Sequence, residues 1–254
     1  MMSALGLDLY STAALLFLAG SALIAGLARG FSGFGSALIF MPLASTVMSA
    51  QIAAPLLLIV DIVTATPLIP RALKQADKRE TVLMAAGALF GAPLGAWALT
   101  QMDPLTIRWM IVILIVPMLA LLMSGWRYVG ERTVLLTTAV GGLSGFFGGV
   151  AQVGGPPTVL YWLRDGGATI MRANIILFFA MLSVITTFSY LASGILTSSI
   201  LGLALVAGPV YGLGIWLGSH MFGLASEKTF QRVCYALIAI AAVISLPILD
   251  GVLR

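Results

Sequence analysis

GLARGFSGFGS, residues 26–36, is the first of two glycine-dense stretches in this chain, and GGLSGFFGGVAQVGGPP, residues 141–157, is the second. Of the 28 glycines in the chain, 11 fall in these two stretches. Glycine weakens a helix interior, and proline removes a backbone donor from it. The two stretches therefore predict two interruptions of helical structure, one near the start of each half of the chain.

The composition indicates where these interruptions lie. Hydrophobic residues make up 60% of the 254 residues and charged residues 9%, against about 25% charged residues in soluble domains. Mean hydropathy is +1.09, and apolar segments of about 20 residues, enough to cross a bilayer, recur along the chain. These values predict an all-α polytopic membrane protein. Its net charge of +4 is interpreted as loop charge on the cytoplasmic side, not as nucleic-acid binding.

Two apolar segments are too short to cross a bilayer, and each follows a glycine-dense stretch. As helices, residues 34–47 and 156–163 rise only about 21 Å and about 12 Å. Non-helical backbone persists in a membrane only against protein or beside a water-filled cavity. Paired interruptions of this kind point to the binding site of a transporter. The alternative is close helix packing through small residues; we expect a substrate site at the two interruptions.

The two halves of the chain resemble each other in the order of their glycines. At an offset of 115, Gly26, Gly30 and Gly33 match Gly141, Gly145 and Gly148. A Gly-x-Trp sequence that begins at Gly95 recurs at Gly214, an offset of 119. This order predicts an N-terminal repeat over residues 1–125, a connector over residues 126–132 and a C-terminal repeat over residues 133–254.

The distribution of Lys and Arg predicts how the repeats are oriented. Basic residues gather in the loops at residues 71–80, 126–132 and 164–172, which we therefore place in the cytoplasm. The loop at residues 193–199 has no basic residue and is placed outside. Arg108 is the exception to this distribution, because it is expected just inside the outer end of its helix. The pattern predicts two inverted-topology repeats, each with a glycine-broken, re-entrant-like region followed by three transmembrane helices.

The motifs of both stretches resemble those of the sulfite exporter TauE/SafE family. The first stretch with Pro42 matches G-x-x-x-G-x-x-G-x-G…P, and residues 148–161 match GG-x-x-x-x-GGPP-x-x-x-Y. Residues 87–99 and 172–174 resemble further family segments, so the similarity covers essentially the whole chain. It implies a secondary transporter that moves small anions outward, typically sulfur oxyanions or sulfonates. The chain departs from the common pattern at Arg29 and at Ala151-Gln152.

Candidate substrate ligands lie in the two stretches. Interrupted helices present N–H groups and a positive dipole end, which suit an anion. Pro156 and Pro157 fit the first turn of a helix that restarts after the second interruption. Arg29 either attracts the anion or extends to the membrane interface. The predicted substrate-binding residues are Arg29, Ser32, Gly33, Gly35, Ser36, Gln152, Gly154, Gly155, Pro156 and Thr158.

Other residues have two open interpretations each. Asp61 lies deep in an apolar segment and is either a proton carrier or a structural carboxylate bonded to a neighbouring helix. Arg172 and Asn174 begin a helix at the cytoplasmic face, where they either gate the path or anchor the helix. Two rows of glycines are expected to be packing faces: Gly87, Gly91 and Gly95, and Gly208 and Gly212.

The sequence offers no constellation for catalysis, metal binding or nucleotide binding. We therefore expect no enzyme activity and no cofactor. The expected function is secondary active export of a small anion, most consistent with a sulfur oxyanion or organosulfonate, by alternating access at a central site formed by both interruptions. The alternative is an anion channel with the interruptions as its filter. The expected partners are the anion, the lipid of a bacterial-type inner membrane and, in a homodimer, a second copy.

Overall fold

The computed structural model describes residues 9–32, 35–125, 128, 130–162, 168–221 and 227–249, and every regular element in them is a helix. In chain order the elements are α1 (Thr12–Ser32), α2 (Ser36–Ala44), α3 (Ala50–Ala65), η3 (Thr66–Leu68), α4 (Ile69–Gln75), α5 (Lys78–Gln101), α6 (Pro104–Ser124), α7 (Val134–Ala151), α8 (Gly155–Trp162), α9 (Ala168–Ala192), α10 (Ser198–Met221), α11 (Glu227–Ile244) and η4 (Pro247–Leu249).

Seven helical segments in the described residues are long and apolar enough to cross a membrane. They are α1, the continuous segment from α3 to α4, α5, α6, α7, α9 and α10. In contrast, α2 has nine residues and α8 has eight, and each begins within the last residues of a glycine-dense stretch. Most of each stretch is helical: residues 26–32 end α1 and residues 141–151 end α7, so the predicted interruptions are limited to the few residues between the helices. The predicted all-helical, multi-pass architecture is therefore confirmed, as is a short helix after each stretch.

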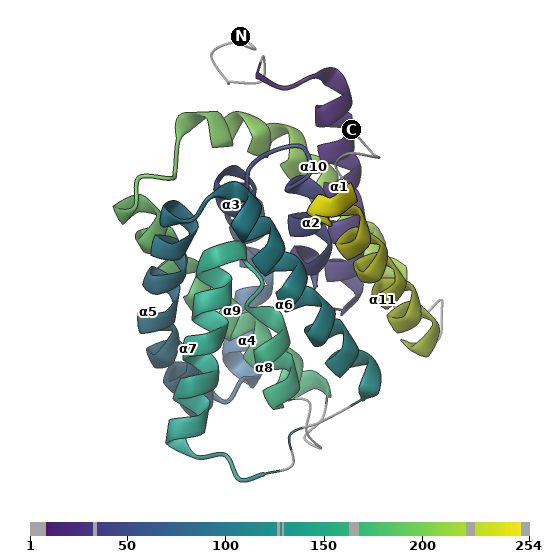
Figure 1. The fold of residues 1–254 in the computed structure, drawn as a ribbon. Coiled ribbons are helices and arrows are strands. Elements are labelled where there is room, and N and C mark those ends of the chain that lie inside the picture. The colour runs from purple at the N-terminus through teal and green to yellow at the C-terminus, as the bar shows by residue number, and fades with distance from the viewer. Residues whose placement is uncertain are drawn as a thin grey trace. The chain divides into compact units, whose positions relative to one another are not determined.

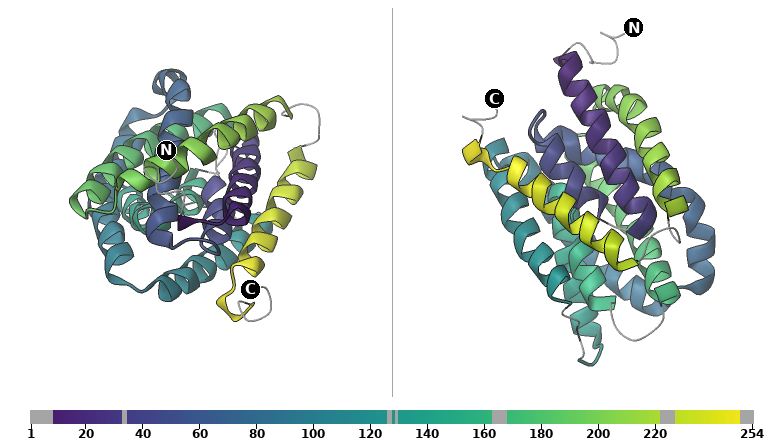
Figure 2. Two further views of the ribbon diagram at one scale, coloured as in Figure 1. Left: turned by 90° about the horizontal axis from the view of Figure 1, so that it is seen from above. Right: turned by 90° about the vertical axis from the view of Figure 1, so that its right-hand side faces the viewer.

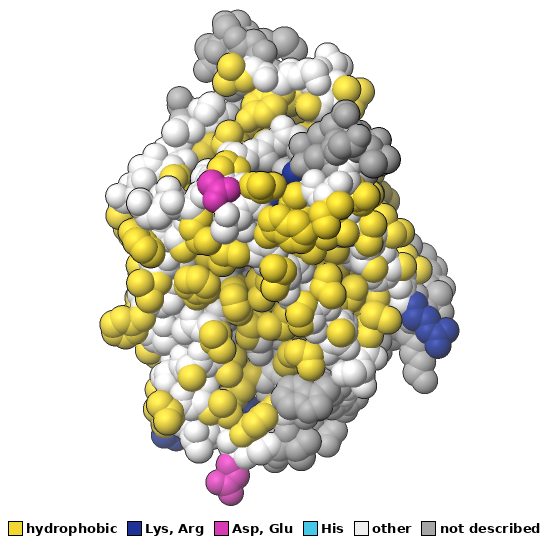
Figure 3. Space-filling model, in the orientation of Figure 1, with side chains coloured by type: hydrophobic (Ala, Val, Ile, Leu, Met, Phe, Trp, Pro, Cys, Tyr) yellow, Lys and Arg dark blue, Asp and Glu magenta, His cyan; other side chains and the backbone are white. Residues whose placement is uncertain are grey.

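Apolar side chains cover much of the outside of the molecule. Phe90, Leu135 and Phe188 are among many large hydrophobic residues that are mostly exposed. Figure 3 shows one face of the molecule, where hydrophobic side chains dominate and few charged ones appear. Such a surface is unfavourable in water, but it matches the hydrocarbon interior of a bilayer.

Polar side chains cap the starts of several helices, among them α6 and α7. At α6, the Asp103 carboxylate accepts a hydrogen bond from the backbone N–H of Thr106 at 2.9 Å and another from the Thr106 hydroxyl. The hydroxyl bond contributes most to holding the pKa of Asp103 below its ordinary value. At α7, the Thr133 hydroxyl accepts from the backbone N–H of Leu136 at 3.2 Å. These caps satisfy N–H groups that a helix leaves unpaired at its start.

The helices form two compact units, and each unit combines segments from both halves of the sequence. Unit 1 consists of Met1–Val60, Met102–Met123 and Leu196–Arg254, and it contains α1, α2, most of α3, α6, α10 and α11. Unit 2 consists of Asp61–Gln101 and Ser124–Ile195, and it contains α4, α5, α7, α8 and α9.

Unit 1 is built on the packing of α1 against α10, which lie side by side in Figures 1 and 2. A Cβ atom on Gly26 or Gly30 would lie less than 3.0 Å from a backbone carbonyl of α10, and one on Gly214 or Gly218 equally close to a carbonyl of α1. The missing side chains therefore allow the two backbones to touch. At Gly208, a Cβ would find only ordinary contact, 3.8 Å from Val60, so the prediction of a packing glycine there was wrong.

Unit 2 is built on α5 and α7, which pack against each other along most of their length (Figure 1). Gly87, Gly91 and Gly95 on α5 face the backbone carbonyls of Thr138, Gly142 and Phe146 on α7. Both sets are spaced by four residues, so one ridge of each helix fits against the other. The predicted packing row on α5 is confirmed.

Candidate functional site

The first interruption lies in unit 1, between α1 and α2. Gly35 precedes α2 with φ of 92°, a left-handed conformation that side chains disfavour. The next residue, Ser36, is buried, as are all nine residues of α2. A helix that is apolar on every side avoids water on every side, and α2 packs against α1 and α11. The interruption thus ends in a short helix enclosed by unit 1.

The other predicted residues of this interruption are described only in part. Arg29 lies in the last turn of α1 and is half-buried. A cation there also interacts favourably with the negative end of the helix dipole. The backbone of Ser32 ends α1, whereas its side chain and all of Gly33 lie outside the described residues. In the described part, the structure places Arg29, Gly35 and Ser36 in one unit.

The second interruption lies in unit 2, where α7 ends in an αL cap at Gln152. The backbone N–H of Val153 donates to the carbonyl of Phe147 at 3.2 Å, and that of Gln152 to the carbonyl of Gly148 at 2.9 Å. Gln152 has φ of 58°, and it is the one non-glycine residue with positive φ in the part of the chain that the structure describes. This position usually holds glycine, because a side chain costs free energy there.

The short helix α8 restarts the chain three residues later. It begins Gly155-Pro156-Pro157, so the predicted prolines do occupy its first turn. Because proline has no backbone N–H, Gly154 and Gly155 supply the amides that this helix start can offer to a ligand. Gly155 is half-buried, and a Cβ there would lie 3.7 Å from Phe179, an ordinary contact. Gly155 is therefore not held in close backbone packing.

Two predicted ligands of this interruption have structural partners. A Cβ on Gly154 would lie 2.6 Å from the carbonyl oxygen of Ser144, and the Ser144 hydroxyl donates to the carbonyl of Gly154. The Thr158 hydroxyl is fully buried and donates to the carbonyl of Gly155 at 2.6 Å. Its one hydrogen is thus engaged within α8. Of the predicted residues of this interruption, Gln152 and Gly155 are half-buried, and they could present a side-chain amide and a backbone N–H group to a ligand.

Tyr190 on α9 is part of this interruption, although the sequence did not indicate it. Its ring is fully buried, and its hydroxyl donates to the carbonyl of Gly149 at 2.7 Å. The same hydroxyl oxygen accepts a bond from Nε2 of Gln152 at 3.3 Å. The available signal was a tyrosine near the end of an apolar segment, where its hydroxyl requires a polar partner.

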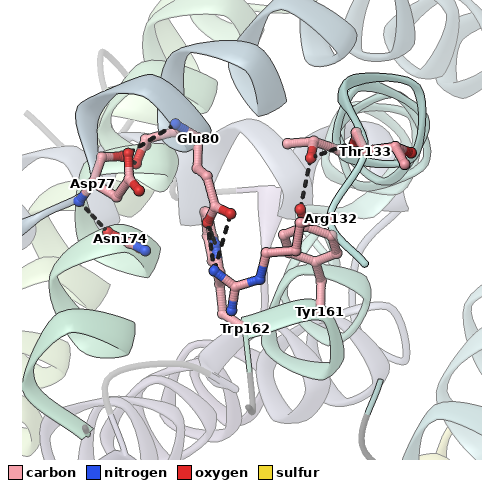
Figure 4. A network of polar contacts seen from close by, with 9 residues as sticks. Asp77, Glu80, Arg132, Thr133, Tyr161, Trp162 and Asn174 are labelled. Atoms are coloured by element: carbon pink, nitrogen blue, oxygen red, sulfur yellow. Dashed lines mark hydrogen bonds and ion pairs between the residues drawn. The ribbon is translucent and has the colours of Figure 1, made fainter. Parts of the chain in front are cut away.

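A polar network ties the other end of α8 to α5 (Figure 4). Nη1 of Arg132 lies 2.9 Å and 2.8 Å from the two carboxylate oxygens of Glu80. The Trp162 indole donates to the same carboxylate at 3.0 Å, and the guanidinium of Arg132 lies 5.5 Å from the centre of the Tyr161 ring. Tyr161 and Trp162 end α8, so the network fixes this helix to the first turn of α5.

Replacing Glu80 with glutamine is expected to lower the stability of the folded chain by about 1–2 kcal/mol, since a charge-assisted bond is lost while an acceptor for Trp162 remains. The side chains of Glu80 and Arg132 are only 17% and 30% exposed, so solvent weakens their interaction less than at an open surface. Thermal unfolding at two salt concentrations measures the effect. Glu131→Gln, at the exposed position before Arg132, is the matched control. Equal shifts of the unfolding temperature in both variants would show that the Glu80 carboxylate does not stabilise the network.

The remaining predicted residues lie apart from the interruptions along the chain. Asn174 is buried on α9, and its side-chain oxygen accepts from the backbone N–H of Asp77 at 2.7 Å (Figure 4). This bond ties α9 to the turn before α5 and supports the anchoring interpretation. Arg172 is exposed, and Asp61 is half-buried in α3. Arg108 on α6 is only 6% exposed, so this arginine lies inside unit 1.

These features define a multi-pass helical membrane protein with two short helices that each follow an interruption at the end of a glycine-containing helix. A comparison with protein-family models matches residues 18–245 to the sulfite exporter TauE/SafE family. The chain belongs to this family, which confirms the resemblance seen in its motifs. Comparisons with curated proteins and with solved structures found no match. The family implies a membrane transporter that exports sulfite or sulfonates.

Proposed function

We propose that this protein is a secondary active carrier that exports a small sulfur oxyanion or organosulfonate by alternating access, and that the second interruption binds the anion. The observation that carries the proposal is the start of α8. Two prolines in its first turn leave Gly154 and Gly155 as amide donors, and a Cβ on Gly155 would make only an ordinary contact, 3.7 Å from Phe179. A helix N-terminus with unpaired amides favours an anion.

An inverted repeat supports alternating access, because two similar halves can exchange roles as the carrier opens to either side. We propose the repeats 1–125 and 133–254 with the connector 126–132. The starts of α2 and α8, Ser36 and Gly155, are 119 positions apart, as are Gly95 and Gly214. This constant offset pairs α1 with α7 and α5 with α10. The pairing is reciprocal in the fold, since α1 packs on α10 and α7 packs on α5.

Export is favoured by the membrane potential. A bacterial-type inner membrane is negative inside, which favours outward movement of an anion by about 2.3 kcal/mol per charge per 100 mV. The Lys and Arg residues in the loops at residues 71–80 and 126–132 support a cytoplasmic location for these loops. No nucleotide is therefore required for export in this proposal.

The experiment is efflux of sulfite from proteoliposomes that contain the purified full chain. A carrier is expected to saturate with sulfite concentration, and efflux is expected to increase when the inside is made negative with a potassium gradient and valinomycin. Efflux that rises linearly with sulfite and large single-channel currents in planar bilayers would instead indicate an anion channel. Protein-containing vesicles that lose sulfite no faster than empty ones would refute sulfite as the substrate.

Asp61→Asn tests whether export is coupled to protons through this carboxylate. The substitution keeps the shape and most hydrogen bonds but removes the titrating charge. In the proton-carrier interpretation, the variant is expected to lose the part of sulfite flux that a pH gradient drives, while flux driven by a sulfite gradient alone persists. The measurement compares both fluxes in one vesicle preparation. In the structural interpretation, the variant is expected to unfold at lower temperature; wild-type flux and stability together would exclude both roles.

A further inference from the structure

The end of α7 places a long polar side chain where a glycine would be less strained. Gln152 adopts φ of 58° and ψ of 13° directly after the helix. Glycine occupies this conformation without the steric cost that a Cβ imposes. Strained backbone that persists in a structure is a reason to look for a function of the side chain. The function we seek is therefore one that the Gln152 amide performs and that glycine could not.

Tyr190 holds that amide in one orientation. The last carbonyls of a helix have no partner within it, and the Tyr190 hydroxyl donates its one hydrogen to the Gly149 carbonyl at 2.7 Å. The hydroxyl oxygen can then only accept, so it faces the NH₂ group of Gln152, 3.3 Å away, and not the amide oxygen. The network thus selects one of the two flipped orientations of the Gln152 amide.

The geometry leaves this amide able to bind an anion. Nε2 carries two hydrogens, so one bond to Tyr190 still leaves a donor. Gln152 is half-buried, whereas Tyr190 is fully buried behind it. Gln152 also precedes Gly154 and Gly155, whose backbone amides begin α8. A neutral donor adds selectivity for an oxyanion without binding it so tightly that release is slow.

We propose that Tyr190 is a positioning residue, which orients the Gln152 amide so that an N–H group faces the anion at the second interruption. The inference rests on the proposed function, because it assigns the anion to this interruption. It adds a residue in α9 that does not touch the anion itself. It also predicts that Tyr190 matters for binding only while residue 152 is glutamine.

The test is a double-mutant cycle on the purified full chain, with sulfite affinity and unfolding temperature measured for each variant. Tyr190→Phe keeps the ring and removes the hydroxyl, so it is expected to weaken sulfite binding roughly three- to tenfold, the loss of one hydrogen bond. Gln152→Gly is expected to weaken binding by a similar factor while keeping or raising the unfolding temperature, since glycine relieves the backbone.

The decisive variant carries both substitutions. Tyr190→Phe is expected to lower the unfolding temperature in either background, because the Gly149 carbonyl loses its partner. When it is combined with Gln152→Gly, it is expected to cause no further change in sulfite affinity. Ser189→Ala is the matched control: it removes a buried hydroxyl from the neighbouring position, whose bond runs within α9 to the carbonyl of Ile185. This control is expected to bind sulfite like the wild type.

Unchanged sulfite affinity in Tyr190→Phe would overturn the inference. An equal loss of affinity in the wild-type and Gln152→Gly backgrounds would also overturn it, because Tyr190 would then act through the fold or contact the anion itself. Sulfite efflux from vesicles separates this inference from the proposed function. A wild type that binds sulfite without exporting it would refute the carrier and leave the cycle valid. A wild type that does not bind sulfite would overturn both.

Discussion

Replacing Gly91 with alanine is expected to prevent stable folding of unit 2. The new Cβ would lie less than 3.0 Å from the backbone carbonyl of Gly142 on α7, and real Cβ atoms do not approach so closely. Gly87 and Gly95 hold the same two helices at the same separation, so α5 cannot move away at one point alone. Overpacking a core with one extra group costs about 1–3 kcal/mol, and more where backbone must move; we expect the upper end of this range or beyond.

The measurement for Gly91→Ala is the yield of monodisperse protein after detergent extraction, together with its unfolding temperature. Gly208→Ala and Gly20→Ala are matched controls in apolar helices. A Cβ at Gly20 meets nothing within 4 Å, and one at Gly208 meets Val60 at 3.8 Å. Because alanine favours a helix by about 1 kcal/mol over glycine, both controls are expected to fold at least as well as the wild type. Equal yields from all three variants would show that α5 and α7 do not pack through this row.

Replacing Gly155 with leucine is expected to abolish sulfite export while the protein still folds. A Cβ at Gly155 makes only an ordinary contact with Phe179, and the backbone there is not left-handed. The larger side chain fills the space beside the amides that begin α8. Misplacing a bound substrate by about 1 Å can reduce turnover about 100-fold, so we expect at least this loss. Gly155→Ala should fall between leucine and the wild type.

The leucine variant is judged by efflux per amount of folded protein. Gly20→Leu adds the same side chain to an open helix position and is expected to export sulfite normally. Gly154→Ala provides a contrast one residue away: its Cβ would lie 2.6 Å from the Ser144 carbonyl, so folding is expected to suffer before transport does. Wild-type efflux from Gly155→Leu would refute a substrate site at the second interruption.

Several features of the fold follow from local sequence alone. The Gly87, Gly91 and Gly95 row predicted helix packing, because glycines four residues apart leave one flat helix face. Pro156 and Pro157 predicted the restart of α8, because the first turn of a helix is where proline fits best. In both cases the residue type limits the backbone of its own segment, and no knowledge of the partner is needed.

Other features could not be predicted because they depend on distant segments. The α10 glycines that pack are Gly214 and Gly218 and not Gly208, which is decided by where α1 lies. The comparison of glycines aligned Gly26 with Gly141; in the repeat that we propose from the helix starts, the offset of 119 instead pairs Gly26 with Gly145. Glycines recur every four residues along these helices, so their spacing alone does not define how the two repeats align. The position of the interruption in each repeat gives the alignment that we propose.

The candidate site likewise contains residues that the sequence indicated and one that only the structure revealed. The sequence identified both interruptions and included Gln152 and Gly155 in the second. It assigned Thr158 to the substrate as well, although the Thr158 hydroxyl donates to a carbonyl of its own helix. It did not indicate Tyr190, which reaches Gln152 from a helix 38 residues further along the chain.

By itself, the sequence determined that this is a multi-pass helical membrane protein, and it predicted two interrupted helices. A bilayer requires apolar side chains and internally paired backbone in every segment, so composition and the lengths of the apolar segments suffice for the first conclusion. The TauE/SafE family followed from the motifs and from the match to the family model. Only the tertiary structure decided which helices touch, which polar side chains are engaged, and which remain available to a ligand. Those outcomes depend on contacts between residues that are far apart in the chain and are absent from any local pattern.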